Sequence, residues 1–98
     1  MIGRIRFGDR AKIAIDNLSS KDEQKVIETI RLLEGFPSDP QTRSRVYKLR
    51  QLANHFVARA GLKYRIIFTY NDHEITIIDI VHHDRLERLF GSSGEDRR

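Results

Sequence analysis

The fold is decided by the stretch YRIIFTYNDHEITIIDIV, residues 64–81. Its first part, residues 64–70, is rich in aromatic and β-branched side chains, which is typical of a β-strand. The polar residues 71–73 predict a short hairpin turn, after which residues 74–81 return as an apolar strand. We therefore expect an antiparallel β-hairpin in the second half of the chain.

Two further strands and a terminal helix are predicted around this hairpin. Residues 55–60 form a plausible strand just before it, and residues 2–7 alternate apolar and basic side chains as a strand does. Residues 84–90 are predicted to be a short helix or turn. The polar residues 91–98 are predicted to form a disordered tail.

Two helices are predicted between the first strand and residue 35. Asp9 can cap the first, and Ser20 with Glu23 forms a capping box that opens the second. Each helix carries one apolar stripe: Ala11, Ala14, Ile15 and Leu18 in the first, and Val26, Ile27, Ile30 and Leu33 in the second. Gly35 stands where a glycine commonly follows a helix, and the prolines of residues 36–40 exclude further helix. The two-residue link between the helices predicts an antiparallel helical hairpin.

The predicted element order is β-α-α-β-β-β, which makes the fold class α+β. We expect the N-terminal helical hairpin to pack on one face of a mostly antiparallel four-stranded sheet. The chain has 98 residues, which is enough for one domain with a hydrophobic core, and we assign that domain to residues 1–90. There is no cysteine, so disulfides and thiolate metal sites are excluded.

The basic residues are concentrated in one segment of the chain. The net charge is +4, and residues 40–71 hold seven lysines and arginines and no acidic residue. Residues 1–39 hold seven basic and seven acidic residues, and residues 72–98 hold four basic and seven acidic ones. Because charges on neighbouring strands normally alternate in sign, an all-basic segment of sheet favours a surface that faces phosphate groups over an ordinary solvated face.

Several kinds of site and location are not expected. The N-terminus is charged within four residues and lacks the apolar segment of a signal peptide, and no apolar run is long enough to span a membrane. We therefore expect a soluble protein of the cytoplasm with no membrane partner. We expect no cofactor, and no zinc site, since no pair of histidines has ligand spacing with a third ligand apparent.

The sequence resembles the RelE/ParE toxin superfamily in the order and spacing of its parts. The motif YRIIF, residues 64–68, follows a basic strand and a short turn, and the last strand runs into VHHDR, residues 81–85. The segment KLRQL, residues 48–52, is similar to the family's loop before the second strand, and two helices precede it. The resemblance covers residues 2–90.

The resemblance implies the RelE/ParE fold and the role of a toxin in a type II toxin–antitoxin system, with a cognate antitoxin that masks the basic surface. It leaves the activity open, because the superfamily holds two activities on one fold. RelE-like members are endoribonucleases that cut messenger RNA on the ribosome, whereas ParE-like members inhibit DNA gyrase. A third alternative is a catalytically weakened member that acts as a binding module. We expect ribonuclease activity, with the ribosome and mRNA as further partners.

Two arginines are candidates for stabilising charge during RNA cleavage. Without a metal ion, this reaction needs a base for the 2′-hydroxyl, positive groups for the phosphorane and an acid for the leaving 5′-oxygen. Arg65 is the main candidate for the positive group, because a guanidinium is always charged and offers a fork to two phosphate oxygens. The resemblance places the family's phosphate-stabilising arginine there, and the alternative is a cross-strand partner for Asp79. Arg59 matches one of two basic residues that the family carries two apart, and the other position is Val57, which cannot act as a base.

His82 and His83 are the candidates for acid and base, because an imidazole titrates near neutral pH and a guanidinium does not. The resemblance matches His83 more closely to a catalytic histidine that ends the last strand in some ribonuclease members. Since side chains alternate between the faces of a strand, we expect the two histidines to lie on opposite faces, so that at most one points into the cleft that would bind RNA. The alternative is that one histidine packs and the other is exposed. His55 and His73 are expected to be ordinary surface residues.

Further residues are candidates for binding RNA. Lys48, Arg50 and Arg85 resemble contacts to the phosphate backbone, which add affinity without sequence choice, and Lys63 belongs to the same basic segment as the first two. Phe90 stands where many relatives have a tyrosine. It either stacks on a base of the RNA or is a hydrophobic plug for the terminal turn.

Overall fold

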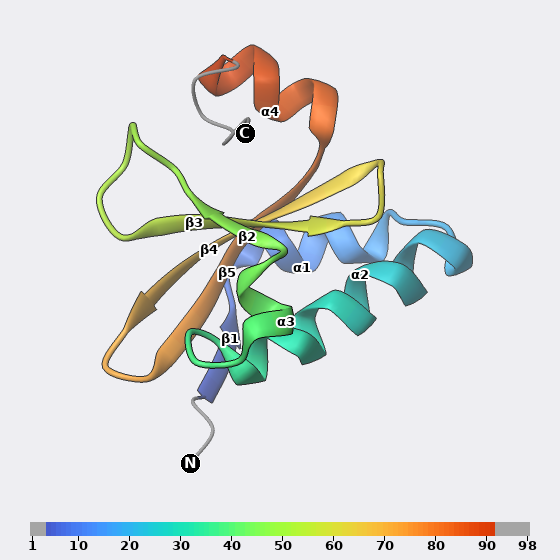
Figure 1. Ribbon diagram of the computed structural model, residues 1–98. Coiled ribbons are helices and arrows are strands. Elements are labelled where there is room, and N and C mark those ends of the chain that lie inside the picture. The colour runs from blue at the N-terminus through green and yellow to red at the C-terminus, as the bar shows by residue number, and fades with distance from the viewer. Residues whose placement is uncertain (1–3, 92–98) are drawn as a thin grey trace.

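A five-stranded sheet with helices on both faces forms the protein (Figure 1). The computed structural model describes residues 4–91. Its elements are β1 (Arg4–Phe7), α1 (Asp9–Asp16), α2 (Ser20–Leu32), the 3₁₀ turn η1 (Leu33–Gly35), α3 (Pro40–Arg43), β2 (Val46–Lys48), β3 (His55–Ala60), β4 (Tyr64–Asn71), β5 (Glu74–His82) and α4 (His83–Phe90). The strand order is β1-β5-β4-β3-β2, with β1 parallel to β5 and the other neighbours antiparallel. The predicted α+β class is confirmed.

β4 and β5 form the predicted hairpin. Between them, Asp72 and His73 have φ angles of 48° and 65°. Two-residue hairpin turns commonly require this left-handed conformation at both central positions. Each of the two strands continues one residue further than the sequence predicts, to Asn71 and to His82.

Two hydrophobic clusters lie on opposite faces of the sheet. The helix-side core consists of Ala11, Val26, Ile30, Leu33, Ala58, Ala60, Ile66, Phe68, Ile75, Ile77 and Ile80. The α4-side core consists of Tyr47, Leu49, Val57, Ile67, Val81 and Leu86, with Ile78 and Phe90 packed against it. In Figure 1, α1, α2 and α3 lie on one side of the sheet, whereas α4 and the β2–β3 loop rise on the other. The apolar stripes predicted for the two N-terminal helices therefore face the sheet.

The sequence prediction misses two short elements, β2 and α3. β2 is the fifth strand and lies at the edge of the sheet, where the prediction has four strands. Its three residues are too few to display the alternation by which a strand is recognised. The prediction that the prolines exclude further helix is wrong at Pro40, because a proline in the first helical turn gives up no hydrogen bond that the helix needs.

The N-terminal helices begin one residue away from their predicted caps. The N-cap of α1 is Gly8, and Asp9 is already in the first turn. The N-cap of α2 is Ser19, whose Oγ accepts a hydrogen bond from the backbone N–H of Asp22 at 3.2 Å. The link between the two helices therefore comprises residues 17–19.

Gly35 has a different role from the predicted one. It ends the 3₁₀ turn η1 and does not adopt the left-handed conformation of a glycine that follows a helix. A Cβ at this position would lie 2.8 Å from the Cβ of Asp39. Glycine therefore allows the backbone at residue 35 to lie close to the Asp39 side chain.

Some predictions concern residues outside the described part of the chain. The predicted disordered tail, residues 91–98, lies outside it except for Gly91, and so do the first residues of the predicted N-terminal strand. Within residues 4–91, no helix is long and apolar enough to cross a membrane.

Candidate functional site

Arg59 and Arg65 lie side by side on neighbouring strands. They are directly paired in the register of β3 and β4, and Arg65 is paired in turn with Val81 of β5. Side chains of directly paired residues project from the same face of a sheet, and Val81 belongs to the α4-side core. The two arginines therefore lie on the sheet face of the α4-side core. In Figure 1, the N-terminal helices lie on the other side of the sheet from α4.

Arg65 is buried, with only 8% of its surface exposed. Its Nη1 donates hydrogen bonds to the carbonyl oxygens of Tyr64 at 3.0 Å and of Gly61 at 3.3 Å. Its Nε is buried without a hydrogen-bond partner among residues 4–91. The guanidinium thus supports the β3–β4 turn and retains one unsatisfied donor, which costs about 1–3 kcal/mol and is uncommon in folded proteins.

Asp79 is not the partner of Arg65, so the alternative role predicted for this arginine is wrong. The Asp79 carboxylate accepts a hydrogen bond from the backbone N–H of Ile80 at 2.8 Å and lies 3.8 Å from the guanidinium of Arg10 in α1. In the sheet, Asp79 is paired with Ile67, two residues beyond Arg65. The bonds of Arg65 go to the backbone of the β3–β4 turn instead.

Arg59 lies over the aromatic ring of Tyr47. Its Cζ is 4.9 Å from the ring centroid, within the range of a cation–π contact. Val57 lies two residues earlier on the same face and is completely buried in the α4-side core. The resemblance implies a basic pair at positions 57 and 59. In this chain Arg59 carries a half-buried charge, whereas Val57 belongs to the core.

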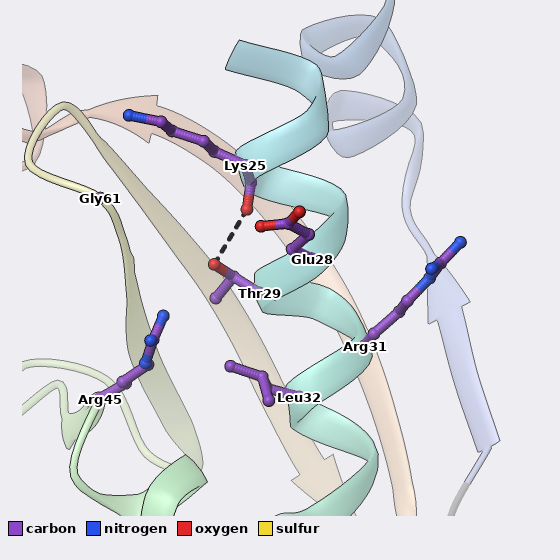
Figure 2. A pocket seen from close by; sticks show the side chains of 7 residues that line it. All are labelled: Lys25, Glu28, Thr29, Arg31, Leu32, Arg45 and Gly61. Atoms are coloured by element: carbon purple, nitrogen blue, oxygen red, sulfur yellow. Dashed lines mark hydrogen bonds between the residues drawn. The ribbon is translucent and has the colours of Figure 1, made fainter. Parts of the chain in front are cut away.

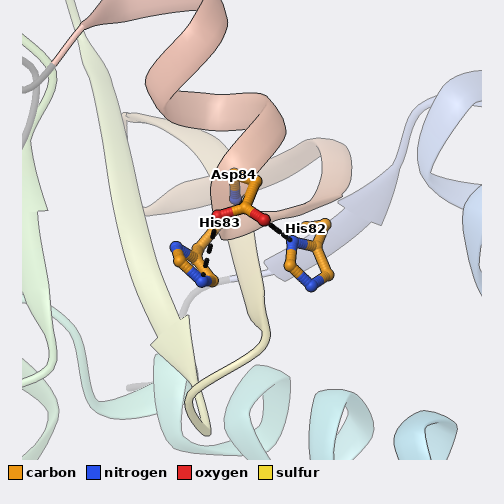
Figure 3. Close-up of side chains that lie close together, drawn as sticks. All are labelled: His82, His83 and Asp84. Carbon is orange, nitrogen blue, oxygen red and sulfur yellow. Dashed lines mark hydrogen bonds and ion pairs between the residues drawn. The ribbon is translucent and has the colours of Figure 1, made fainter.

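His82, His83 and Asp84 come together where β5 runs into α4 (Figure 3). The two imidazole rings stack, with centroids 5.0 Å apart and an interplanar angle of 26°. The prediction that they point to opposite faces is wrong, because β5 ends at His82 and strand alternation no longer applies to His83. The Asp84 carboxylate is close to both rings, with Oδ1 3.3 Å from His83 Nε2 and Oδ2 3.7 Å from His82 Nδ1. His82 Nδ1 also accepts a hydrogen bond from the backbone N–H of Asp84 and so caps α4.

The β3–β4 turn supports the histidines as well as Arg65. The backbone N–H of His83 donates to the carbonyl oxygen of Lys63 at 2.7 Å. The ring of Tyr64 meets the ring of His82 edge-on, with centroids 5.9 Å apart. Because Arg65 donates to the carbonyls of Gly61 and Tyr64, the arginine and the histidine pair are both fixed to one short stretch of backbone. The side chains nevertheless lie on different faces of the sheet. Arg59 and Arg65 are on the α4 side, whereas His82 is paired with Tyr64, whose ring packs on the helix-side core.

A basic pocket of about 480 Å³ lies on the other side of this turn, between the turn and α2 (Figure 2). Its lining consists of Lys25, Glu28, Thr29, Arg31, Leu32, Arg45 and Gly61. Three cationic side chains and one carboxylate give the lining a positive net charge. Thr29 Oγ1 donates to the carbonyl oxygen of Lys25 at 3.0 Å, which satisfies the hydroxyl within α2.

No protein-family model and no curated protein matches the sequence. Solved structures do match. One chain of the archaeal RelE–RelB complex from Pyrococcus horikoshii is 25% identical, with a TM-score of 0.68, and the match covers 87% of this chain and 99% of that one. A chain of the toxin–antitoxin complex RelBE2 from Mycobacterium tuberculosis is 24% identical, with a TM-score of 0.69 and coverage of 84% and 99%. The isolated RelE toxin of E. coli is 14% identical, with a TM-score of 0.65 and coverage of 89% and 98%.

The fold of the chain is that of the RelE toxins in these structures. The resemblance read from YRIIF and VHHDR is therefore confirmed at the level of the fold, over most of the chain and nearly all of the matched ones. Because this fold serves more than one activity, membership alone does not assign a reaction to the residues described above.

The remaining cationic candidates are spread over the RelE/ParE fold. Arg50 is exposed in the β2–β3 loop, which rises on the α4 side. Lys48 is paired with Phe56, which packs on the helix-side core, so Lys48 lies on the other face from the two arginines. Arg85 is exposed on α4 and lines a pocket of about 420 Å³ together with residues of α1 and β5. Of these three, Lys48 is the one that the sheet separates from Arg59 and Arg65.

Phe90 packs against the α4-side core at the end of α4. Its carbonyl oxygen accepts a hydrogen bond from Gln51 Nε2 at 2.9 Å, which ties the last turn of α4 to the β2–β3 loop. The side chain thus has the position of a hydrophobic plug. The ring is partly exposed there, so stacking on a base of RNA stays the alternative.

Lys63 lies on the helix side of the RelE/ParE fold, away from the two arginines. Its Nζ is 3.3 Å from Oδ2 of Asp22 in α2. It also lies over the ring of Tyr64, 5.8 Å from the centroid. The RNA-binding role predicted for Lys63 is therefore not supported by its position, since its charge is already paired with a carboxylate.

The pair with Lys63 sets the protonation of Asp22. Partial burial by itself raises the pKa of this carboxyl, but the hydrogen bond and charge of Lys63 outweigh it, helped by hydrogen bonds of Ser19 and Tyr64, so the pKa is lowered. In the unfolded chain the pKa of an aspartate is about 3.9. Asp22 therefore stabilises the fold above that pH, and the contribution is lost as the pH falls through the lower folded-state pKa.

Lys63→Met is expected to raise the pKa of Asp22, because burial then acts without the opposing charge. An NMR titration of the Asp22 carboxyl measures the change. Lys48→Met, which removes a lysine from the edge strand instead, is the control and should leave the titration as it is. An Asp22 pKa that is the same in wild type and Lys63→Met would contradict the pairing.

Sequence reasoning misses two residues of the site, Asp84 and Tyr47. Asp84 follows the histidines directly, and this adjacency becomes a signal only once the strand is known to end at His82. It also overturns the expectation that no third metal-binding group accompanies a histidine pair. Tyr47, whose ring contacts the guanidinium of Arg59, lies in the short strand β2 and has no comparable signal in the sequence.

Proposed function

We propose that this protein is the toxin of a type II toxin–antitoxin system and acts as a ribosome-dependent endoribonuclease that cleaves mRNA and inhibits translation. The observation that carries the proposal is the pairing of Arg59 with Arg65 on neighbouring strands, next to a β3–β4 turn whose backbone binds both the Arg65 guanidinium and the N–H of His83. The fold supports it, since matched structures include the RelE toxin and YafQ of E. coli. The ribosome and mRNA are the partners of this activity, which takes place in the cytoplasm.

The proposed reaction needs two proton transfers. The 2′-hydroxyl of one nucleotide attacks the adjacent phosphorus, and the bond from phosphorus to the 5′-oxygen of the next nucleotide breaks. A base takes the proton of the 2′-hydroxyl and an acid protonates the leaving 5′-oxygen, so the products end in a 2′,3′-cyclic phosphate and a 5′-hydroxyl. We assign these transfers to His83 and His82, with His83 as the principal residue, because an imidazole both accepts and donates protons near neutral pH. No cofactor or metal ion takes part in these steps.

Arg59 and Arg65 supply positive charge for the phosphorane. A phosphate oxygen that reached Nε of Arg65 would form a charge-assisted hydrogen bond and would also satisfy a donor that is unsatisfied in the free protein. Because that atom is buried, the contact requires side chains on the α4 side to move, and α4 is the helix that packs on this face. Arg59 is half-buried and needs no such movement.

A second candidate function is the inhibition of DNA gyrase, as in ParE-like proteins. Two observations favour it. Val57 is core where the family's ribonucleases carry a basic residue, and Phe90 has no hydroxyl group and packs on the same core. The same two observations would suit a catalytically weakened member that acts as a binding module.

A cognate antitoxin is the proposed protein partner. The matched structures include RelE–RelB and DinJ–YafQ complexes of toxin and antitoxin. On this chain, residues 40–71 carry seven basic and no acidic residues, and the pocket between α2 and the β3–β4 turn has a positive lining. An acidic segment of the antitoxin would be electrostatically complementary to both, and binding would weaken as salt increases.

Induced expression of the protein is expected to stop growth by stopping translation rather than replication. Pulse labelling of protein and DNA after induction measures which synthesis fails first, and primer extension on a reporter mRNA shows whether message is cut. If DNA synthesis failed first while protein synthesis continued and the message stayed intact, gyrase inhibition would replace the ribonuclease.

A further inference from the structure

Three groups of the kind that bind transition metals meet at the junction of β5 and α4 (Figure 3). One ligand atom each of His82, His83 and Asp84 lies within 4.8 Å of the others. Two imidazole nitrogens and a carboxylate are a common ligand set for a zinc ion whose fourth position is open to water or substrate. All three residues are partly exposed, so an ion can reach them from solvent.

The three groups stand somewhat wider apart than the ligands of a tetrahedral site. Ligands about 2.0–2.1 Å from a tetrahedral ion stand about 3.3–3.4 Å from one another. Asp84 Oδ1 is 3.3 Å from His83 Nε2, and Asp84 Oδ2 is 3.7 Å from His82 Nδ1. These two distances involve different oxygens of Asp84, and the ligand atoms lie within 4.8 Å of one another, so the side chains have to rotate to bring three atoms to tetrahedral spacing.

The chemistry of the three groups favours a transition metal ion over magnesium or calcium. Imidazole nitrogen suits zinc, copper and nickel, whereas magnesium and calcium prefer ligand sets made of oxygen. The chain has no cysteine and four histidines, so no thiolate site competes for zinc. Zinc is also redox-inactive and accepts four-coordinate geometry without distortion.

The same contacts indicate that such binding is reversible. Nδ1 of His82 accepts the hydrogen bond that caps α4, and a metal ion at this atom displaces that bond. The positive end of the helix dipole at the α4 N-terminus also disfavours a cation. Because metal binding has these two costs, the cluster differs from a structural zinc site, whose metal ion is required for folding.

We propose that His82, His83 and Asp84 form a reversible zinc-binding site, and that zinc bound there inhibits the protein. The ion takes the imidazole lone pairs that would otherwise accept the proton of the 2′-hydroxyl. The inhibitory part rests on the proposed ribonuclease function, whereas binding of the metal does not.

Zinc binding is tested by calorimetric titration of untagged protein with ZnCl₂, and by the visible absorption of Co²⁺ as a spectroscopic probe of coordination. We expect one ion per chain. His83→Ala and Asp84→Asn should each weaken binding by about tenfold or more, and both leave the backbone cap provided by His82 in place. His55→Ala and His73→Ala are the matched controls and should bind zinc as the wild type does. Circular dichroism verifies that every variant is folded.

The site is refuted if zinc shows no saturable binding to the wild type, or if His83→Ala and Asp84→Asn bind it as tightly as the controls do. Cleavage of ribosome-bound message, measured with and without zinc, tests inhibition separately. A wild type that binds zinc at these residues but cuts no RNA supports the site and overturns the proposed function. A wild type that cuts RNA equally well when saturated with zinc overturns the inhibition.

Discussion

Arg65→Ala is expected to lower the rate of mRNA cleavage by about 10²–10³-fold, the effect typical of removing one preorganised group that stabilises charge in a transition state. The phosphorane gains negative charge on its non-bridging oxygens, and the fork of the guanidinium can meet two of them at once. Arg65→Lys should recover little of the rate, because a lysine offers a point charge without a fork. Cleavage of ribosome-bound message in a reconstituted translation system is the measurement.

The contacts of Arg65 predict a loss of stability beside the loss of rate. Alanine leaves the carbonyls of Gly61 and Tyr64 without their hydrogen bonds, which costs about 1–3 kcal/mol if no water replaces the guanidinium. Phe68→Leu is the matched control, because it is a large-to-small change in the helix-side core that also destabilises the fold but leaves the α4 side intact. An Arg65→Ala protein that is destabilised like Phe68→Leu yet fully active would limit Arg65 to a structural role.

The strands of this protein could be predicted from sequence wherever their pattern was long enough to read. β3, β4 and β5 have six, eight and nine residues, and all three were within two residues of their predicted bounds. β2 has three residues, and its place in the sheet depends on pairing with β3, which is a tertiary contact. The fifth strand therefore follows from the fold and has no local signal.

The candidate site was predictable in its composition but only partly in its geometry. Arg59 and Arg65 were assigned from residue type and resemblance, and the register of β3 and β4 places them together. Lys63 was assigned from charge alone, and charge gives no information about which face a residue at a turn will take. The contact of Lys63 with Asp22 joins residues 41 apart in the chain, which no local pattern reveals.

The histidine pair shows where a local rule stops applying. Alternation of side chains holds within a strand, and the chain leaves β5 between His82 and His83. The signal for this boundary is the acidic residue Asp84 in the first turn of a helix, which favours the helix N-terminus.

His83→Ala is expected to lower the cleavage rate by about 10²–10⁴-fold, the usual contribution of a general acid or base. Its fold should persist, because the ion pair and ring contact of the partly exposed His83 side chain are with Asp84 and His82, and the backbone N–H that bonds to Lys63 is kept. His82→Asn is the informative partner variant. Asparagine is a good N-cap, so it retains the acceptor for the N–H of Asp84 and removes the imidazole.

The two variants together separate proton transfer from support of α4. If His83 carries the reaction and His82 mainly caps the helix, His83→Ala loses activity while His82→Asn keeps most of it. If both imidazoles transfer protons, one as base and one as acid, both variants lose activity to a similar degree, and their double variant loses little more than either. His55→Ala and His73→Ala should cleave message at the wild-type rate, since neither residue lies in the cluster. Full activity in His83→Ala and in His82→Asn would remove the histidines from the mechanism, and other residues would have to supply the acid and the base.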